Sequence, residues 1–361
     1  MRTRYNLRPS TMGASGSVLS VCRGRVHSLI DRGAAEAEKL LIDASSFPKE
    51  VSTLMHLRLA LEMELFDSKV YSDVLKYSKG EDVSEHSIIV EAHSNEELRE
   101  LLAGQGGDCL KVILTAEASE IDDISSTSVS KNVIGLNLAN NILSDESFAN
   151  SPSLLQVSYL HAGGNSCLGN NFYQLLESTG NLLVLDLSYT ENLSLVGPFL
   201  AAPQLRRLCL DGCDLKCTVR RNDDGTSISC FWGLVQLNEL SLKENLFDSI
   251  ESLYGLEFFS FGFMQPVLSH LWLNENPFQG VTADRLAVDT YLVKSIPSLV
   301  LLSDKMLNTT AIGRSDVSKL LTRNGGGNCS SVGGLQGKGL DNMEKEYLAA
   351  LKNERDNTVV S

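Results

Sequence analysis

The chain has 361 residues, of which 43% are hydrophobic and 21% are charged, and its formal net charge is −14 at pH 7. This acidic excess argues against a nucleic-acid partner, because proteins bind the phosphate backbone mainly through clustered Lys and Arg. The sequence contains no apolar run long enough to span a bilayer, which argues against a membrane partner.

The first 32 residues are predicted to form a disordered basic tail. They contain five arginines before the first acidic residue, Asp31, and many serines. An organelle transit peptide has the same composition and is the alternative. Pro9, Gly13 and Gly16 would interrupt a targeting helix, so the plain tail is favoured. Eight cysteines without a regular spacing favour a reducing compartment, and we expect a cytoplasmic or nuclear protein.

Residues 33–85 show a helical pattern. Their leucines recur at three- and four-residue steps, and Pro48 suits the first turn of a second helix. Because the end of a stacked repeat array needs a cover, we expect a helical cap over the first repeats of the array that follows. A helix pair that binds a partner independently is the alternative.

Residues 86–132 carry two weak repeats. Ser87–Val90 and Leu110–Leu114 are predicted to be short strands, and a capping box at Ser94 opens a helix between them. Two 23-residue steps lead from Ser87 through Leu110 to Val133. We interpret the two segments as degenerate repeats, with a separate small α/β domain as the alternative.

Six clear copies of the spacing L-x-x-L-x-L-x-x-N-x-L lie between residues 133 and 305. Their first positions are 24, 25, 23, 32 and 31 residues apart, a period typical of leucine-rich repeats. One repeat cannot bury its apolar face alone, so neighbours must stack. The predicted fold is therefore an α/β leucine-rich repeat solenoid, a curved parallel sheet with a helical or irregular convex side. The copies are VIGLNLANNIL from Val133, VSYLHAGGNSC from Val157, LLVLDLSYTEN from Leu182, LRRLCLDGCDL from Leu205, LNELSLKENLF from Leu237 and LSHLWLNENPF from Leu268.

Two steps of the array are longer than the others. The first contains Cys217–Cys230, where alternating residues around Asp224-Gly225 predict a hairpin insertion. The second is rich in aromatic and leucine residues, which favours packing on the convex side; an exposed docking patch is the alternative. These residues are Leu253, Leu256, Phe258, Phe259, Phe261 and Phe263.

After residue 305 the repeat pattern ends. The Gly-rich residues 306–340 are predicted to be a flexible linker. Residues 341–361 are predicted to form an amphipathic helix and a tail. A helix this short is marginal alone in water, so we expect it to dock on the end of the solenoid, with capture by a partner as the alternative.

The end of the array contains a recognisable sequence. Asn276-Pro277-Phe278 is followed by Tyr291, by Ile296-Pro297-Ser298-Leu299 and by Leu302-Ser303-Asp304. This resembles the terminal cap of the intracellular leucine-rich repeat family that includes the nuclear phosphatase-1 regulatory subunit, the axonemal dynein light chain, the spliceosomal A-prime protein and tubulin-folding cofactor E. Here Ile296 replaces a Leu, and Asp304 is displaced by one position. The resemblance implies a non-catalytic scaffold or regulatory subunit that binds a partner protein by its concave wall; a dynein- or tubulin-associated, cytoskeletal or ciliary role is the alternative.

Asparagines at the ninth position of four copies are predicted to be structural. Their side-chain amides can satisfy the backbone groups of the turn that leaves each strand. These residues are Asn141, Asn165, Asn245 and Asn276.

The two variable positions beside the fourth-position leucine should face the concave wall, because side chains alternate along a strand. The first column contains Gly135, Tyr159, Val184, Arg207, Glu239 and His270, and the second contains Asn137, His161, Asp186, Cys209, Ser241 and Trp272. Tyr, Trp and Arg dominate the energetics of interfaces, although scattered surface aromatics are the plain alternative. We predict that a partner protein binds Tyr159, His161, Asp186, Arg207, Glu239, His270 and Trp272.

No catalytic, metal or cofactor site is predicted. His161, Asp186 and Ser241 would form a triad on paper, but they belong to strands too far apart for a proton relay. The segment 333–339 lacks the spacing of a phosphate loop, and Cys217 and Cys230 lack two further zinc ligands. The predicted function is a protein-interaction scaffold without enzymatic activity.

Overall fold

The computed structural model describes residues 28–40, 55–61, 68–84, 87–103, 111–124, 129–144, 157–165, 181–191, 202–221, 227–231, 233–260, 268–296, 298–303 and 305–307, with single positions at 147, 154 and 193. The predicted tail up to residue 27, the predicted linker beyond residue 307 and the predicted C-terminal helix lie outside the described residues.

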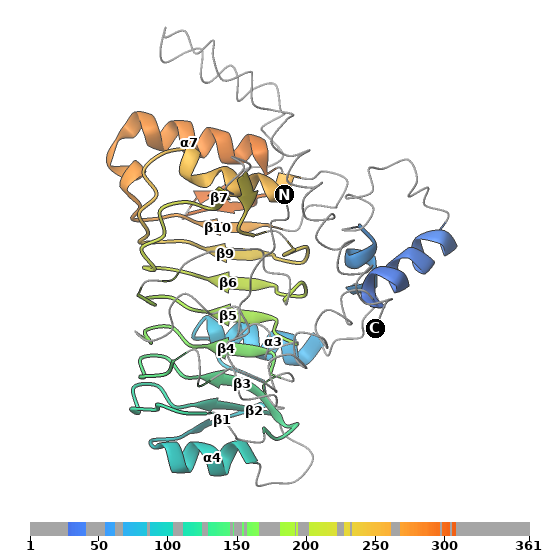
Figure 1. Ribbon diagram of the computed structural model, residues 1–361, viewed down its shortest axis with the longest axis vertical. Coiled ribbons are helices and arrows are strands. Elements are labelled where there is room, and N and C mark those ends of the chain that lie inside the picture. Colours follow the sequence, from blue (N-terminus) through green and yellow to red (C-terminus); the bar gives the residue numbers. More distant parts are fainter. Residues whose placement is uncertain are drawn as a thin grey trace, which may run out of the picture.

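One open sheet runs through the described part of the chain (Figure 1). Its ten strands have the order β1-β2-β3-β4-β5-β6-β9-β10-β11-β12, and every neighbouring pair is parallel except β11 and β12. This arrangement confirms the predicted α/β leucine-rich repeat solenoid. The strands are β1 (Ser87–Glu91), β2 (Lys111–Thr115), β3 (Val133–Asn137), β4 (Tyr159–His161), β5 (Val184–Asp186), β6 (Arg207–Cys209), β9 (Glu239–Ser241), β10 (His270–Trp272), β11 (Leu301–Leu302) and β12 (Lys305–Met306).

The register of the strands keeps equivalent repeat positions side by side. Both predicted columns lie in register from β3 to β10, so they form two continuous rows on one face. We call this face the concave wall. The leucines between the two rows point to the opposite face and are 0% exposed, and each contributes roughly 1.5–3 kcal/mol by its burial. These core leucines are Leu136, Leu160, Leu185, Leu208, Leu240 and Leu271.

The two degenerate repeats are part of the same sheet. β1 and β2 pair in parallel with each other and β2 pairs with β3, and α4 (Asn95–Ala103) connects β1 to β2. The second repeat begins one residue later than predicted, because Leu114 rather than Ile113 pairs with the core residue Leu136. The pairing of β2 with β3 is also irregular, with a register shift between Val112 and Ile113.

The predicted asparagine ladder is confirmed, and Asn245 illustrates it. Its amide nitrogen donates to the carbonyl oxygens of Leu210 (2.8 Å) and Lys243 (2.9 Å). Its amide oxygen accepts from the backbone N–H groups of Cys213 (3.1 Å) and Leu215 (3.0 Å). One buried side chain therefore joins the turns of two successive repeats. Equivalent hydrogen bonds are made by Asn141, Asn165 and Asn276.

The residue before each ladder position adopts a left-handed backbone conformation. For residues other than glycine this conformation costs roughly 1–2 kcal/mol, so the surrounding hydrogen bonds must hold it in place. The φ values lie between 52° and 67° at Ala118, Asn140, Gly164, Tyr189, Gly212, Glu244 and Glu275.

The predicted hairpin insertion is also confirmed. β7 (Val219–Arg221) and β8 (Ser227–Ser229) are antiparallel and lie outside the main sheet, where β6 pairs directly with β9. The hairpin packs on the 3-10 helix η3 (Glu251–Ser260). The Thr218 N–H donates to the carbonyl of Ser252 (2.7 Å), and the Ser229 hydroxyl donates to the carbonyl of Gly255 (2.7 Å).

The aromatic residues of the second long step pack in the core, as predicted for the part that the structure describes. Leu253, Leu256 and Phe258 are buried in the same cluster as the core leucines, and the ring of Phe259 lies 6.0 Å from that of Phe231. Phe261 and Phe263 lie outside the described residues.

The C-terminal end of the sheet is closed by η4 (Pro277–Gly280), α7 (Thr282–Ser295) and β11. Ile296, Leu299 and Leu302 are buried, as the terminal-cap sequence predicts. The Tyr291 hydroxyl donates to Glu257 at 2.6 Å and thereby fixes α7 to η3. None of the described helices is both long enough and apolar enough to cross a membrane.

The N-terminal helices differ in position from the predicted cap over the first repeats. Residues 28–39 and 55–61 are helical, and the first of these helices begins inside the predicted tail. The two helices meet at Gly33, where a Cβ would lie 1.6 Å from the carbonyl oxygen of His56. The Gln236 amide donates to the carbonyl of Arg58 (3.5 Å), which places the second helix near the start of β9. The third helix, α3 (Ser68–Ser78), lies on the concave wall.

We predict that Asn245→Ala lowers the free energy of unfolding by roughly 2–5 kcal/mol, because it leaves several buried backbone groups without a partner. Chemical denaturation of the full chain measures this change. Asn140→Gly is the control, because Asn140 is exposed and its φ of 57° suits glycine. Equal stability of Asn245→Ala and the wild type would contradict the role assigned to the ladder.

Gly255→Ala should lower stability by about 1–3 kcal/mol, because the new Cβ would lie 2.0 Å from the carbonyl oxygen of Thr218 and push the hairpin off η3. Gly280→Ala is a matched control, since no atom lies within 4 Å of a Cβ at that position. Thermal melts of the two variants should therefore differ, and coinciding melts would show that the hairpin is not packed against η3.

Candidate protein-binding wall

The concave wall from β2 to β5 is covered by the chain's own helix α3. Figure 1 shows α3 beside the middle strands of the sheet, and it contacts β3 and β5. The ring of Tyr77 packs edge-on against that of Tyr159, with centroids 5.4 Å apart. Tyr71 and the fully buried Val74 pack against the same patch of the wall. This patch, which we call the α3 groove, consists of Ile113, Ile134, Tyr159, Leu183 and Val184.

The sequence of the wall explains why a helix fits there. The first column is small or apolar from β2 to β5, so it would expose hydrophobic surface to water if it were uncovered. At Gly135 a Cβ would lie 3.1 Å from the ring of Tyr159, so the absence of a side chain leaves room for that ring.

Two charged groups fix the end of α3 to the wall. The ammonium nitrogen of Lys79 lies 2.8 Å from Oε1 of Glu239, and Nη1 of Arg207 lies 2.6 Å from Oε2 of the same carboxylate. Glu239 is only 4% exposed, and these two cations lie within hydrogen-bond distance of its two buried carboxylate oxygens.

Asp73 ties α3 to the start of the sheet. Its carboxylate accepts hydrogen bonds from the N–H (3.0 Å) and hydroxyl (2.7 Å) of Ser84 and from the hydroxyl of Ser87 (2.6 Å). Burial alone would raise the pKa of Asp73, but the hydrogen bonds from Ser87 and Ser84 outweigh it and lower the pKa below its ordinary value.

These contacts divide the predicted site residues into two groups. Tyr159 (3% exposed) and Glu239 (4% exposed) are buried under or beside α3, so neither presents its side chain to a partner in this arrangement. His161, Asp186, Arg207, His270 and Trp272 keep part of their surface exposed.

The open half of the wall is centred on Trp272. Its ring stacks on His270 at a centroid distance of 5.8 Å and an interplanar angle of 24°. The Arg207 guanidinium lies 5.8 Å from the centre of the Trp272 ring system, and the Lys243 ammonium lies 6.0 Å from it. Cations at this distance over an indole ring are attracted by its π electrons. We call Arg207, Lys243, His270 and Trp272 the tryptophan cluster.

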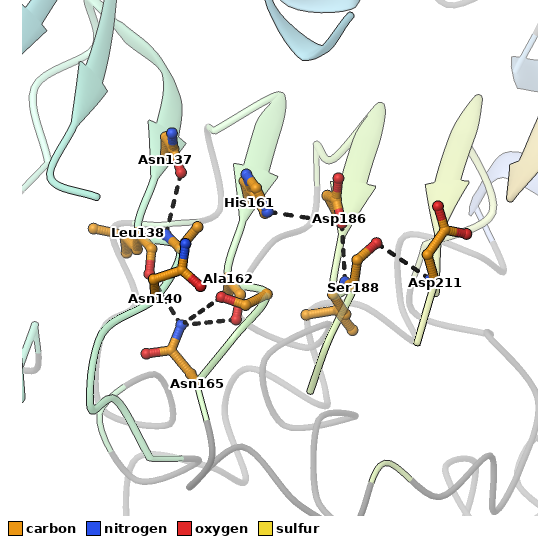
Figure 2. Close-up of polar contacts among 12 residues, drawn as sticks. Asn137, Leu138, Asn140, His161, Ala162, Asn165, Asp186, Ser188 and Asp211 are labelled. Carbon is orange, nitrogen blue, oxygen red and sulfur yellow. Dashed lines mark hydrogen bonds and ion pairs between the residues drawn. The ribbon is translucent and has the colours of Figure 1, made fainter. Parts of the chain in front are cut away.

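Polar side chains along the second row hold the turns that leave the strands (Figure 2). Nε2 of His161 lies 3.8 Å from Oδ1 of Asp186, and the same carboxylate oxygen accepts the N–H of Ser188 (2.9 Å). The Asp211 N–H donates to the Ser188 hydroxyl (3.2 Å), and Asp211 in turn accepts the N–H of Lys243 (2.9 Å). His161 and Asp186 thus lie next to each other, as the columns predict. Asp186 also holds the turn after β5 through its hydrogen bond with Ser188.

Tyr189 is the most exposed aromatic residue at this edge of the wall among the described residues, at 56%. Its ring lies against Gly212, where a Cβ would come within 2.5 Å of it. Its hydroxyl donates to Glu244 (2.9 Å), and this hydrogen bond is the main cause that raises the pKa of Tyr189 to about 12.

The described strands do not bring His161 and Ser241 together. His161 and Ser241 are separated by β5 and β6, which is three strand spacings of ~4.8 Å each. Burial raises the pKa of Cys209 far above that of a free thiol, so it stays protonated at neutral pH. Burial also raises the pKa of Asp211, although hydrogen bonds from Ser241 and Lys243 oppose the shift. The described residues contain no group of three or more His, Cys, Asp or Glu placed to hold a metal ion.

Two contributors to the wall were missed by the sequence analysis. Lys243 occupies the same repeat position as Asp211, two residues after Ser241, so strand alternation could have placed it beside Trp272. No sequence pattern places Lys79 at the concave wall, because 160 residues separate it from Glu239.

Comparison with known proteins adds little to this description. No protein-family model matches the chain, and no curated protein matches it. Among solved structures, an internalin from Listeria monocytogenes str. 4b F2365 is similar, with 18% identity and a TM-score of 0.32. The match covers 54% of this chain and 54% of the internalin chain. The assignment of the fold therefore rests on the strand register and the asparagine ladder of this chain.

We predict that the stabilising effect of Asp73 depends on pH. Because its pKa is lowered in the folded state, its contribution is complete above the ordinary Asp pKa of about 3.9 and is lost as the pH falls through the lower, folded-state value. Asp73→Asn should therefore be less stable than the wild type at pH 7, and the difference should shrink below about pH 4. Urea denaturation of both proteins between pH 7 and pH 3 measures it. A difference that does not change with pH would rule out an ionised, hydrogen-bonded Asp73.

Proposed function

We propose that this chain is a non-enzymatic protein-interaction scaffold whose partner binds the open half of the concave wall. The observation that carries the proposal is the tryptophan cluster. The ring of the half-buried Trp272 lies 5.8 Å from the Arg207 guanidinium and 6.0 Å from the Lys243 ammonium, on a face built from parallel strands. Trp and Arg are the residue types that most often anchor interfaces.

The chemistry of the cluster favours a partner that presents an acidic side chain next to an apolar one. The indole ring supplies flat apolar surface, and Lys243 and Arg207 supply positive charge close to it. Glu239 already neutralises part of the charge of Arg207, so Lys243 is the cation left to meet a carboxylate of the partner. His161 and Asp186 would contact the partner at the rim, further along the second row.

The terminal-cap resemblance supports a regulatory subunit as the finer form of this proposal. Binding to phosphatase-1, or a change in its activity, tests that form directly. The cytoskeletal alternative is tested by co-sedimentation with microtubules, where protein left in the supernatant excludes direct binding.

We predict that Trp272→Ala and Lys243→Ala each weaken binding of the partner at least about tenfold, which corresponds to ~1.4 kcal/mol. The partner is first identified by affinity capture of the wild type and mass spectrometry. Its affinity for each purified variant is then measured by calorimetry. Tyr159→Ala is unsuitable for this purpose, because Tyr159 supports α3.

Lys294→Ala is the matched control for Lys243→Ala, because Lys294 is an exposed lysine on α7. It should leave the affinity unchanged. If both wall variants bind the partner as tightly as Lys294→Ala does, the tryptophan cluster is not the binding surface.

A further inference from the structure

We propose that the α3 groove is a binding site for amphipathic helices, that α3 is its resident occupant, and that a partner helix with the same side-chain pattern binds there by displacing α3. This site is separate from the tryptophan cluster of the proposed function. The side chains that α3 packs against the wall define the partner helix that can replace it.

The first support is that the groove forms its own hydrophobic cluster. Val74 and the groove residues are buried together, apart from the continuous core of leucines on the other face of the sheet. The strands beneath α3 are paired with their neighbours, and their leucines are buried in the core on the opposite face of the sheet. The repeat array is therefore a complete structure onto which α3 docks.

The second support is the nature of the contacts that hold α3. The helix has 11 residues, a length that is marginal for a helix alone in water, so it depends on the wall for its stability. It is held by the side chains of Tyr71, Val74 and Tyr77 and by the ion pair from Lys79, whose side chain is 32% exposed. These are the contacts that a helix bound in a groove makes, with anchors three or four residues apart. The hydrogen bonds of Asp73 with Ser84 and Ser87 tie it to the segment that leads into β1.

These contacts also define the partner. It would carry an aromatic, an aliphatic and an aromatic residue at three-residue steps, as Tyr71, Val74 and Tyr77 do, followed by a lysine that replaces Lys79. Glu239 makes the lysine important, because a helix without a cation would leave this buried carboxylate with Arg207 alone.

The test uses the full-length protein and a fluorescent synthetic peptide of residues 68–82. In the wild type, the tethered α3 competes at an effective concentration in the millimolar range, so the peptide should bind weakly. Val74→Asp places a charge in the cluster and should release α3. We expect fluorescence anisotropy to show at least tenfold tighter binding of the peptide to Val74→Asp than to the wild type.

Three controls make the result specific. Leu286→Asp, at an exposed leucine on α7, should leave the groove closed and behave as the wild type. The double variant Val74→Asp/Val184→Asp should not bind the peptide, because Val184 lines the groove. Trp272→Ala combined with Val74→Asp should still bind it, which separates this proposal from the function proposed for the tryptophan cluster.

A folded Val74→Asp variant that fails to bind the peptide, or a wild type that binds it equally well, would overturn the proposal. Hydrogen exchange on the wild type covers the case in which Val74→Asp does not fold. The amides of α3 should exchange through a local opening, faster than those of β5 and β6. Equal protection of α3 and the strands would mean that the helix opens only with the whole array, and the displacement model would be wrong.

Discussion

The buried asparagine at the end of each strand is the constraint on which the rest of this structure depends. The turn that leaves a strand carries backbone groups that are buried away from water and must be paired. Asn245 pairs groups from its own turn and from the preceding repeat, so it fixes both the turn and the register between neighbouring strands. The left-handed residue before it is acceptable only because these hydrogen bonds hold the backbone there. Once the register is fixed, the repeat position of each residue on the concave wall determines the row in which its side chain lies.

The composition of those rows then decides what the wall can bind. In the first row, small and apolar residues from β2 to β5 form a surface that needs a cover, and α3 supplies it. From β6 onward the row changes to Arg207, Glu239 and His270, and the adjacent row ends in Trp272. The wall is therefore two surfaces of different chemistry, one filled by the chain itself and one open, with Glu239 at the boundary between them.

The sequence was sufficient to predict features that depend on local spacing. The repeat period gave the sheet, both rows, the asparagine ladder and the β7–β8 hairpin, because each follows from residues close together in the chain. The start of the second repeat was predicted one residue too early, because Ile113 and Leu114 are both apolar and either could occupy the core position. The position of α3 could not be predicted, because an apolar helical stripe fits the end of an array as well as its wall. The burial of Tyr159 and Glu239 follows from that helix, and so it was missed as well.

The hairpin insertion has a consequence for how a ligand would meet this protein. The first positions of the repeats of β6 and β9 are 32 residues apart, against 23 to 25 for the preceding steps, yet these two strands are direct neighbours. The described part of the additional length, β7 and β8, lies outside the main sheet and rests on η3. Distance along the concave wall is therefore counted in strands and not in residues, with a constant pitch of ~4.8 Å. The spacing between the residues that a ligand would contact on successive strands therefore stays constant, even where the loops behind the sheet differ in length and sequence.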